Sequence, residues 1–103
     1  MVANLDIMPD HVAALCQRHH IRRLSFFGSV LRDDFHPGSD VDMLVEFETG
    51  HTPGWEIVDI EQEFSQLLGG RKIDMVNPKY LNRHLKERIL RTAVLQYEAS
   101  DGT

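Results

Sequence analysis

Apolar residues recur along this chain at two spacings, one typical of helices and one typical of strands. Amphipathic helical spacing predicts three helices, at 9–20, 55–68 and 80–97. Short runs of bulky or β-branched residues predict three strands, at 23–27, 41–47 and 72–76. The predicted order is therefore helix, strand, strand, helix, strand, helix.

The connections between the predicted strands indicate how they pair. The loop between the first two has room for at most one helical turn, at 30–32, which favours an antiparallel pair. The second and third are joined through a helix of about twelve residues, which suits a right-handed parallel crossover. Gly69 and Gly70 should end that helix as a left-handed cap. We expect an α/β (α+β) fold, with a small mixed sheet and helices packed against it.

Length and charge narrow the possible functions. The 103 residues fit a single domain over 1–103, with residues 98–103 expected to be disordered. A net charge of −5 argues against a free-standing nucleic-acid binder, although divalent cations could still recruit a nucleotide. The single cysteine, Cys16, excludes an internal disulfide and is expected to lie on an apolar helix face. The sequence shows no signal peptide and no long apolar run, so we expect a cytoplasmic protein.

Three aspartates are placed where a packing role is unfavourable. Asp40 and Asp42 are two residues apart at the start of the second predicted strand, so they share one face. Two close carboxylates repel unless a cation lies between them, and oxygen ligands suit Mg²⁺ or Mn²⁺. Asp74 lies within the third predicted strand, level with Asp42 if the two strands are parallel. The three carboxylates would then form a site for two-metal phosphoryl transfer, although Asp74 could instead be an edge-strand charge.

A Gly-Ser pair ends the first predicted strand. In an antiparallel pair, Gly28 and Ser29 would face Asp40 and Asp42, and glycine lets a ligand approach the backbone closely. Backbone N–H groups of the next turn and the Ser29 hydroxyl could hold phosphate oxygens. Arg32 could contact a triphosphate or could be an ordinary surface arginine.

Gly28-Ser29, ten residues, then Asp40-Val41-Asp42 resembles the Gly-Ser-x10-Asp-x-Asp motif of the DNA polymerase β-like nucleotidyltransferase superfamily. Asp74, within 72–76, is similar to the third carboxylate of that family, and the final helix resembles that of the minimal nucleotidyltransferases of the MNT or MntA type. One departure is Asp33, where many minimal members have glycine after the arginine.

The resemblance implies a specific activity and partner. Asp40, Asp42 and Asp74 would be the catalytic and metal-binding residues, holding two Mg²⁺ or Mn²⁺ ions, and Gly28, Ser29 and Arg32 would bind ATP. The acceptor would be a tyrosine hydroxyl of a separate HEPN-domain toxin, which the chain would adenylylate as an antitoxin in a hetero-oligomer. Exposed apolar positions on the last helix would form the docking surface. Two alternatives stay open: a non-catalytic antitoxin or binding module, and a nucleotidyltransferase for a small molecule such as an aminoglycoside.

The histidines and aromatic residues give weaker signals. The six histidines lie on different predicted elements or diverge on one helix, so we expect surface or cap roles and no metal set. Trp55, Phe64 and Tyr97 lie on or beside apolar helix faces and are expected in the core or in an interface.

Overall fold

The computed structural model describes residues 7–33, 36 and 38–99 of the chain. In chain order the elements are α1 (Pro9–Arg18), β1 (Ile21–Phe27), the 3₁₀ turn η1 (Gly28–Leu31), β2 (Val41–Phe47), α2 (Glu56–Leu67), β3 (Ile73–Val76), the 3₁₀ turn η2 (Pro78–Tyr80), α3 (Arg83–Thr92) and β4 (Val94–Glu98). The first five predicted elements are present within a few residues of their expected bounds.

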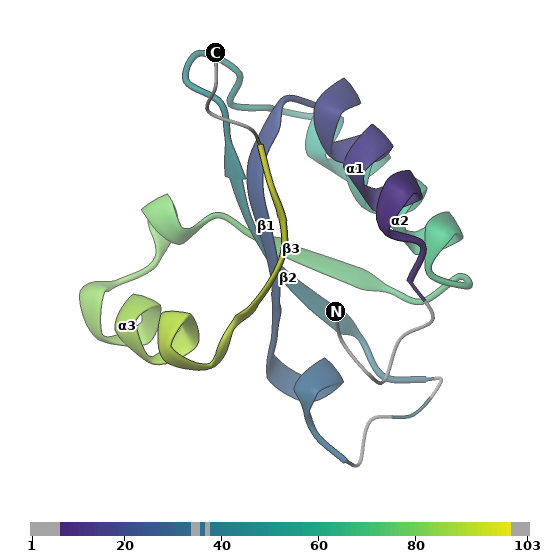
Figure 1. Cartoon of the computed structure of the whole chain (residues 1–103). Coiled ribbons are helices and arrows are strands. Elements are labelled where there is room, and N and C mark those ends of the chain that lie inside the picture. The colour runs from purple at the N-terminus through teal and green to yellow at the C-terminus, as the bar shows by residue number, and fades with distance from the viewer. Residues whose placement is uncertain (1–6, 34–35, 37, 100–103) are drawn as a thin grey trace.

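The strands form one mixed sheet in the order β3-β2-β1-β4 (Figure 1). β1 pairs antiparallel with β2, and β2 pairs parallel with β3, so both predicted pairings are confirmed. β1 also pairs antiparallel with β4 on its other side. This topology places the end of β1 and the starts of β2 and β3 at the same end of the sheet.

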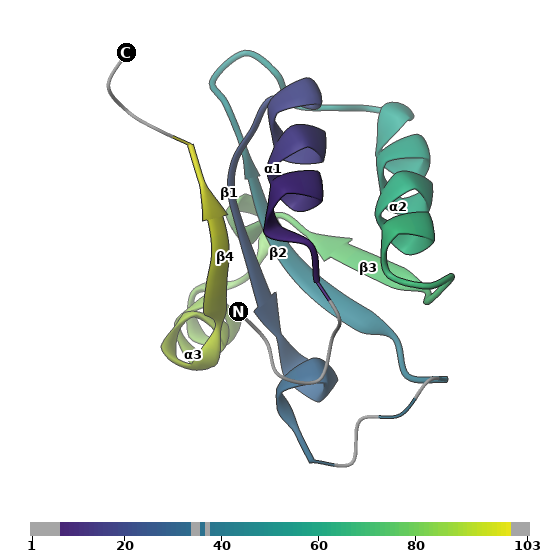
Figure 2. The same ribbon diagram turned by 45° about the vertical axis from the view of Figure 1, so that its right-hand side comes forward.

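The core lies between the sheet and two helices. Figures 1 and 2 show α1 and α2 side by side on one face of the sheet, with α3 on the other side. Val12 and Cys16 of α1 and Ile60 and Phe64 of α2 are buried against apolar strand residues such as Phe26. Each large side chain of this kind contributes roughly 1.5–3 kcal/mol by leaving water. The predicted core roles of Cys16 and Phe64 are confirmed.

Two glycines end α2 and turn the chain into β3. Gly69 and Gly70 have φ values of 80° and 86°, which residues with a side chain adopt only at a cost. The Gly70 N–H donates to the Ser65 carbonyl at 2.7 Å, and the Gly69 N–H donates to the Gln66 carbonyl at 3.4 Å. This pattern is a Schellman cap, so the predicted left-handed cap is confirmed.

The predicted final helix at 80–97 is wrong in its second half. Helix α3 ends at Thr92, and Ala93 takes an extended conformation with φ −62° and ψ 141°. β4 follows and adds a fourth strand to the sheet. Val94 and Tyr97 are three residues apart, a spacing typical of one face of a helix. A register shift in the pairing with β1 lets both of them pack against the core from a strand.

Two further expectations change with the structure. Glu98, predicted to lie in a disordered tail, belongs to β4, and its Oε2 accepts a hydrogen bond from Arg23 Nη2 at 2.6 Å. Residues 100–103 lie outside the described part of the chain. Trp55 has 93% of its surface exposed, so its expected core role is wrong and only an interface role stays open.

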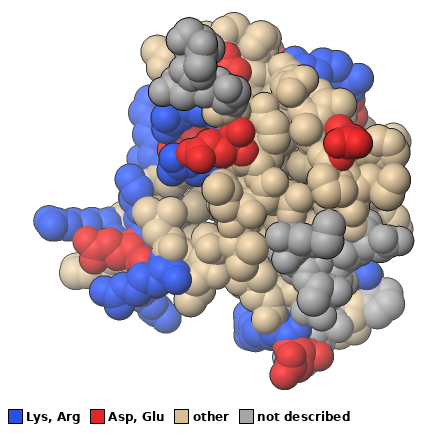
Figure 3. All heavy atoms as spheres, viewed as in Figure 1, with Lys and Arg blue, Asp and Glu red and all other residues tan. Residues whose placement is uncertain are grey.

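Basic side chains gather at one side of the molecule. Helix α3 carries Arg83, Lys86, Arg88 and Arg91 against the single acid Glu87. Figure 3 shows this blue group on the left, where Figure 1 places α3. No residue of α3 is buried, and its apolar Leu85 and Leu90 are 41% and 47% exposed. Across the described residues, none of the helices is both long enough and apolar enough to traverse a bilayer.

Candidate active site

Asp42 occupies the centre of the candidate site, near the start of β2. Its Cα partners are Phe27 on β1 and Asp74 on β3. The neighbours Val41 and Met43 are buried in the core below α1 and α2, so Asp42, which alternates with them, projects to the opposite face. The Asp42 side chain is half-buried between its two neighbouring strands.

Asp74 lies on the same face as Asp42, and Asp40 lies at the same end of the sheet. Directly paired residues on neighbouring strands project to the same side of a sheet and are about 5 Å apart, which places Asp74 beside Asp42. Asp40 directly precedes β2, two residues from Asp42, and is exposed, as is Asp74. The prediction that Asp74 lies level with Asp42 on the neighbouring strand is therefore confirmed. It follows from the parallel register of β2 and β3.

Gly28 is in close contact with the Asp42 carboxylate. It ends β1 with φ +76°, and a Cβ atom built on it would lie 2.4 Å from Asp42 Oδ2. Real Cβ contacts are essentially never that short, so only glycine leaves room for the carboxylate in this position. The predicted opposition of the Gly-Ser corner and Asp42 is present. Ser29 lies in η1 on the same corner.

The segment that leads into Asp40 is held by short-range hydrogen bonds. The Ser39 N–H donates to the His36 carbonyl at 2.9 Å, and the His36 N–H donates to Ser39 Oγ at 3.2 Å. Arg71 Nη1 donates to the same His36 carbonyl at 3.1 Å, which ties this segment to the start of β3. The Val41 N–H then donates to the Lys72 carbonyl at 2.8 Å. The Arg71 contact could not be predicted from the sequence, because it depends on the parallel pairing of β2 and β3.

Arg32 is exposed and follows η1 directly, at the same end of the sheet. The structure thus brings Gly28, Asp40, Asp42 and Asp74 to one end of the sheet, with Ser29 and Arg32 on the adjoining turn.

The donor set at this end fits a hard divalent cation. Three carboxylates lie at one end of the sheet, and one of them, Asp42, is half-buried beside a position that only glycine fits. Carboxylate oxygens are the ligands that Mg²⁺ and Mn²⁺ prefer, and a bound cation removes the repulsion among the acids.

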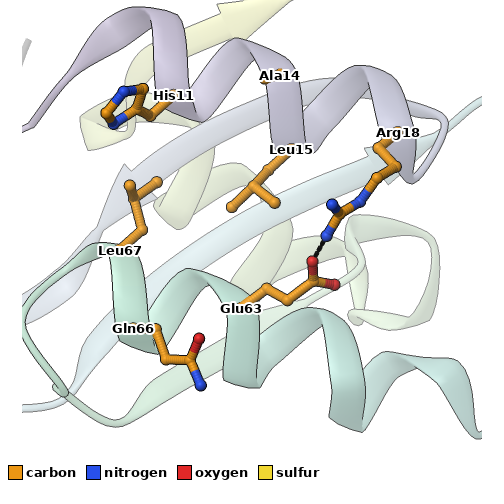
Figure 4. A pocket seen from close by; sticks show the side chains of 7 residues that line it. All are labelled: His11, Ala14, Leu15, Arg18, Glu63, Gln66 and Leu67. Carbon is orange, nitrogen blue, oxygen red and sulfur yellow. Dashed lines mark ion pairs between the residues drawn. The ribbon is translucent and has the colours of Figure 1, made fainter.

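A hollow lies between α1 and α2. Figure 4 shows Leu15 and Leu67 facing each other across it, with the ion pair of Arg18 and Glu63 at one end. His19 Nε2 also lies 2.6 Å from Glu63 Oε2. These contacts join the two helices on the face of the sheet opposite to the aspartates, and none of the predicted site residues lines this hollow.

Two of the histidines, both exposed as expected of surface roles, meet in the structure. The rings of His20 and His51 are stacked, with centroids 3.8 Å apart and planes 13° apart. His20 precedes β1 and His51 lies in the loop between β2 and α2, at the end of the sheet away from Asp42. Sequence spacing could not reveal this pair, since the antiparallel pairing of β1 and β2 brings it together.

A comparison with known protein families agrees with the fold. Residues 8–95 match the family model described as nucleotidyltransferase domain. Because this match covers most of the chain, the protein belongs to the nucleotidyltransferase domain family and is a nucleotidyltransferase.

Named relatives narrow the family further. Protein adenylyltransferase MntA of Thermococcus cleftensis is 33% identical over 90 residues, covering 86% of this chain and 88% of that protein. A candidate protein adenylyltransferase of Methanocaldococcus jannaschii is 31% identical over 91 residues, covering 88% of this chain and 96% of its own. The resemblance to the MntA-type minimal nucleotidyltransferases is therefore confirmed.

Solved structures share the fold. A candidate minimal nucleotidyltransferase is 36% identical, with a TM-score of 0.70, and the match covers 84% of this chain and 86% of that one. A toxin–antitoxin structure with AMP-PNP has a TM-score of 0.72 at 14% identity, covering 91% of this chain and 76% of that one. The second likeness, at this low identity, concerns the fold alone.

Proposed function

We propose that this chain is a metal-dependent protein adenylyltransferase that moves AMP from ATP to a tyrosine hydroxyl of a separate HEPN-domain toxin and so acts as its antitoxin. The observation that carries the proposal is the convergence of Gly28, Asp42 and Asp74 at one end of the sheet. Relatives named protein adenylyltransferase, and the likeness in fold to a toxin–antitoxin structure with AMP-PNP, support it.

Each site residue has a definite task in this proposal. Asp40, Asp42 and Asp74 hold two divalent ions, Mg²⁺ or Mn²⁺, through their carboxylate oxygens. Gly28 leaves the backbone open for the triphosphate, and the η1 corner with Ser29 binds phosphate oxygens. Arg32 is placed to contact the triphosphate from the adjoining turn. The ions, when bound, neutralise phosphate charge and make an acceptor hydroxyl easier to deprotonate.

The reaction is an in-line displacement at the α-phosphorus of ATP. The acceptor oxygen forms a bond to the α-phosphorus, the bond to the bridging oxygen of pyrophosphate breaks, and pyrophosphate leaves. The proton of the acceptor hydroxyl passes to the Asp74 carboxylate, which is exposed and can release it to solvent. Asp42, held between two strands, keeps a fixed position throughout, as positioning for this chemistry requires.

The acceptor side of the site must come from a partner. Helix α3 supports this view, because a helix with no buried residue and two exposed leucines gains little from its own chain. Its four basic residues contrast with the net charge of −5, so an acidic partner surface would complement it. We assign α3 as the toxin-docking helix, in a hetero-oligomer of the two proteins.

Label transfer tests the proposal directly. The purified chain is incubated with Mg²⁺, α-labelled ATP and the product of the neighbouring reading frame, and labelled protein is identified by mass spectrometry. Wild-type chain should label the partner on tyrosine, and Asp42→Asn should lose the label. Asp59→Asn, on an exposed position of α2 outside the site, serves as the matched control and should keep it.

The remaining outcomes separate the alternatives. A partner that is bound and silenced equally by Asp42→Asn would contradict the catalytic mechanism and favour a non-catalytic antitoxin. Transfer to a small molecule such as an aminoglycoside, with no protein labelled, would contradict the proposed acceptor. Label on a residue other than tyrosine would overturn that detail alone.

A further inference from the structure

The corner between α1 and β1 and the loop after β2 form a second cluster of side chains with metal-binding atoms. His20, Glu48 and His51 each offer one such atom, and the three atoms all lie within 4.8 Å of one another. We propose that these three residues bind a borderline divalent cation, with Zn²⁺ as the best match, at a site separate from the aspartate site.

The backbone fixes the three residues relative to one another. The Glu48 N–H donates to the His20 carbonyl at 2.8 Å, and the His51 N–H donates to the Glu48 carbonyl at 2.9 Å. Gly50, at φ +85°, makes the turn that returns His51 toward Glu48. Two main-chain hydrogen bonds therefore hold the three donors close before any ion arrives, which lowers the cost of ordering them on binding.

His20 has a backbone conformation that is unusual for a residue with a side chain. It is the one non-glycine residue with positive φ, at 58°, among the residues that the structure describes. This conformation costs of order 1–2 kcal/mol relative to an ordinary one. It turns the chain sharply between α1 and β1 and brings the His20 ring over the β2–α2 loop, against His51.

The donor chemistry differs from that of the aspartate site. Two imidazoles and one carboxylate are a ligand set that zinc uses with a fourth position left for water, whereas Mg²⁺ prefers oxygen ligands alone. Two ligand atoms of one tetrahedral zinc ion are about 3.3 Å apart, so the three groups need to close by only about 1.5 Å. The rings must also turn out of their parallel stack, which both can do because both side chains are exposed.

Neighbouring acids are already engaged, and Glu48 is directed to the histidines. Glu46, two residues earlier, pairs with Arg22 at 3.0 Å and with Arg23 at 3.5 Å. Glu48 is half-buried at the end of β2, within 4.8 Å of both imidazoles. A bound ion would connect this strand end, the loop at 49–54 and the α1–β1 corner.

This site lies far from the candidate active site. Asp42 and Glu48 are six residues apart along an extended strand, which corresponds to about 20 Å. The two sites therefore cannot share an ion, and each can be removed without the other. The inference stands on this cluster alone and does not depend on the proposed transferase reaction.

Zinc titration of the full chain tests the inference. Metal-free protein is titrated with ZnCl₂ by calorimetry, while NMR follows the imidazole ring protons. Wild type should bind Zn²⁺ with shifts at His20 and His51, and His51→Ala should weaken the affinity at least about tenfold. His20→Asn should do the same, and asparagine tolerates the left-handed backbone at this position, so the fold is kept.

Two controls separate this site from other zinc-binding groups. His84→Ala removes an exposed histidine of α3 and should leave the affinity unchanged. Asp42→Asn should also keep the zinc site. No saturable zinc binding by wild type, equal affinity in His51→Ala and wild type, or loss of binding in Asp42→Asn would overturn the inference.

Discussion

Gly28→Ala is the sharpest test of the site geometry, because two effects of the substitution can be separated. The first is backbone strain: at φ +76°, alanine costs about 1–2 kcal/mol in the left-handed region, partly offset by the lower entropy of the unfolded chain. The second is the new Cβ, 2.4 Å from Asp42 Oδ2, where ordinary contact begins at 3.4 Å. The carboxylate must therefore move by about 1 Å.

A matched substitution isolates the second effect. Gly69 has a similar φ of +80°, and a Cβ atom there meets nothing within 4 Å. Gly69→Ala should lower stability by about the same 1–2 kcal/mol, or about 4–8 °C in Tm for each kcal/mol, without touching the site. Gly28→Ala should lower Tm similarly and also displace Asp42. A misplacement of about 1 Å can cost about 100-fold in rate.

The assay compares initial rates of labelled AMP transfer, and Mn²⁺ affinity by titration, in the two variants at a temperature well below both melting points. We expect a loss of about 100-fold in Gly28→Ala relative to Gly69→Ala. Equal rates in the two variants would refute the reasoning that Gly28 holds the Asp42 carboxylate in place. A rate loss of the same size in Gly69→Ala would show that strain alone is responsible.

Four further predictions concern the core and the docking helix. Phe64→Ala, at a fully buried position of α2, should lower the free energy of unfolding in urea by about 3–5 kcal/mol. Val58→Ala, at an exposed position of the same helix, should lower it by under about 0.5 kcal/mol. Equal losses in the two variants would contradict the described core. Burial raises the pKa of the Cys16 thiol to about 12, so a thiol reagent at pH 8 should label it only after unfolding. The unfolded thiol ionises near pH 8.5, whereas the folded one stays protonated. The contribution of Cys16 to the free energy of unfolding should therefore fall by about 1.4 kcal/mol per pH unit above that value. A difference in unfolding free energy between wild type and Cys16→Ala that does not change with pH would contradict this. Leu90→Asp on α3 should leave Tm within about 2–4 °C of wild type and weaken binding of the partner protein, measured by calorimetry; unchanged binding would contradict the docking role.

Most of the fold could be predicted from the local pattern of apolar and polar residues along the chain. Periodicity located α1, α2 and the first three strands, because each buries one apolar stripe or face that repeats at the period of its backbone. Loop length gave the strand directions, since a short connection returns antiparallel and a helical crossover returns parallel. From those directions, the sequence alone predicts that the aspartates lie at one end of the sheet.

The features that were predicted wrongly share one physical reason. Each depends on contacts between segments that are distant in the sequence. Val94 and Tyr97 have a helical spacing, and only their pairing with β1, with its register shift, makes them part of a strand. Trp55 looks like a core residue in sequence, but nothing in the described structure covers it.

The sequence by itself determined the elements up to β3, the pairings of β1 with β2 and of β2 with β3, and the residues that form the candidate active site. Only the tertiary structure decided the fourth strand, the contact of Gly28 with the Asp42 carboxylate, and the meeting of His20 with His51. Local patterns report which face of an element is apolar. Close contacts between segments depend on register and on turns such as the left-handed His20, and these form only when the whole sheet is assembled.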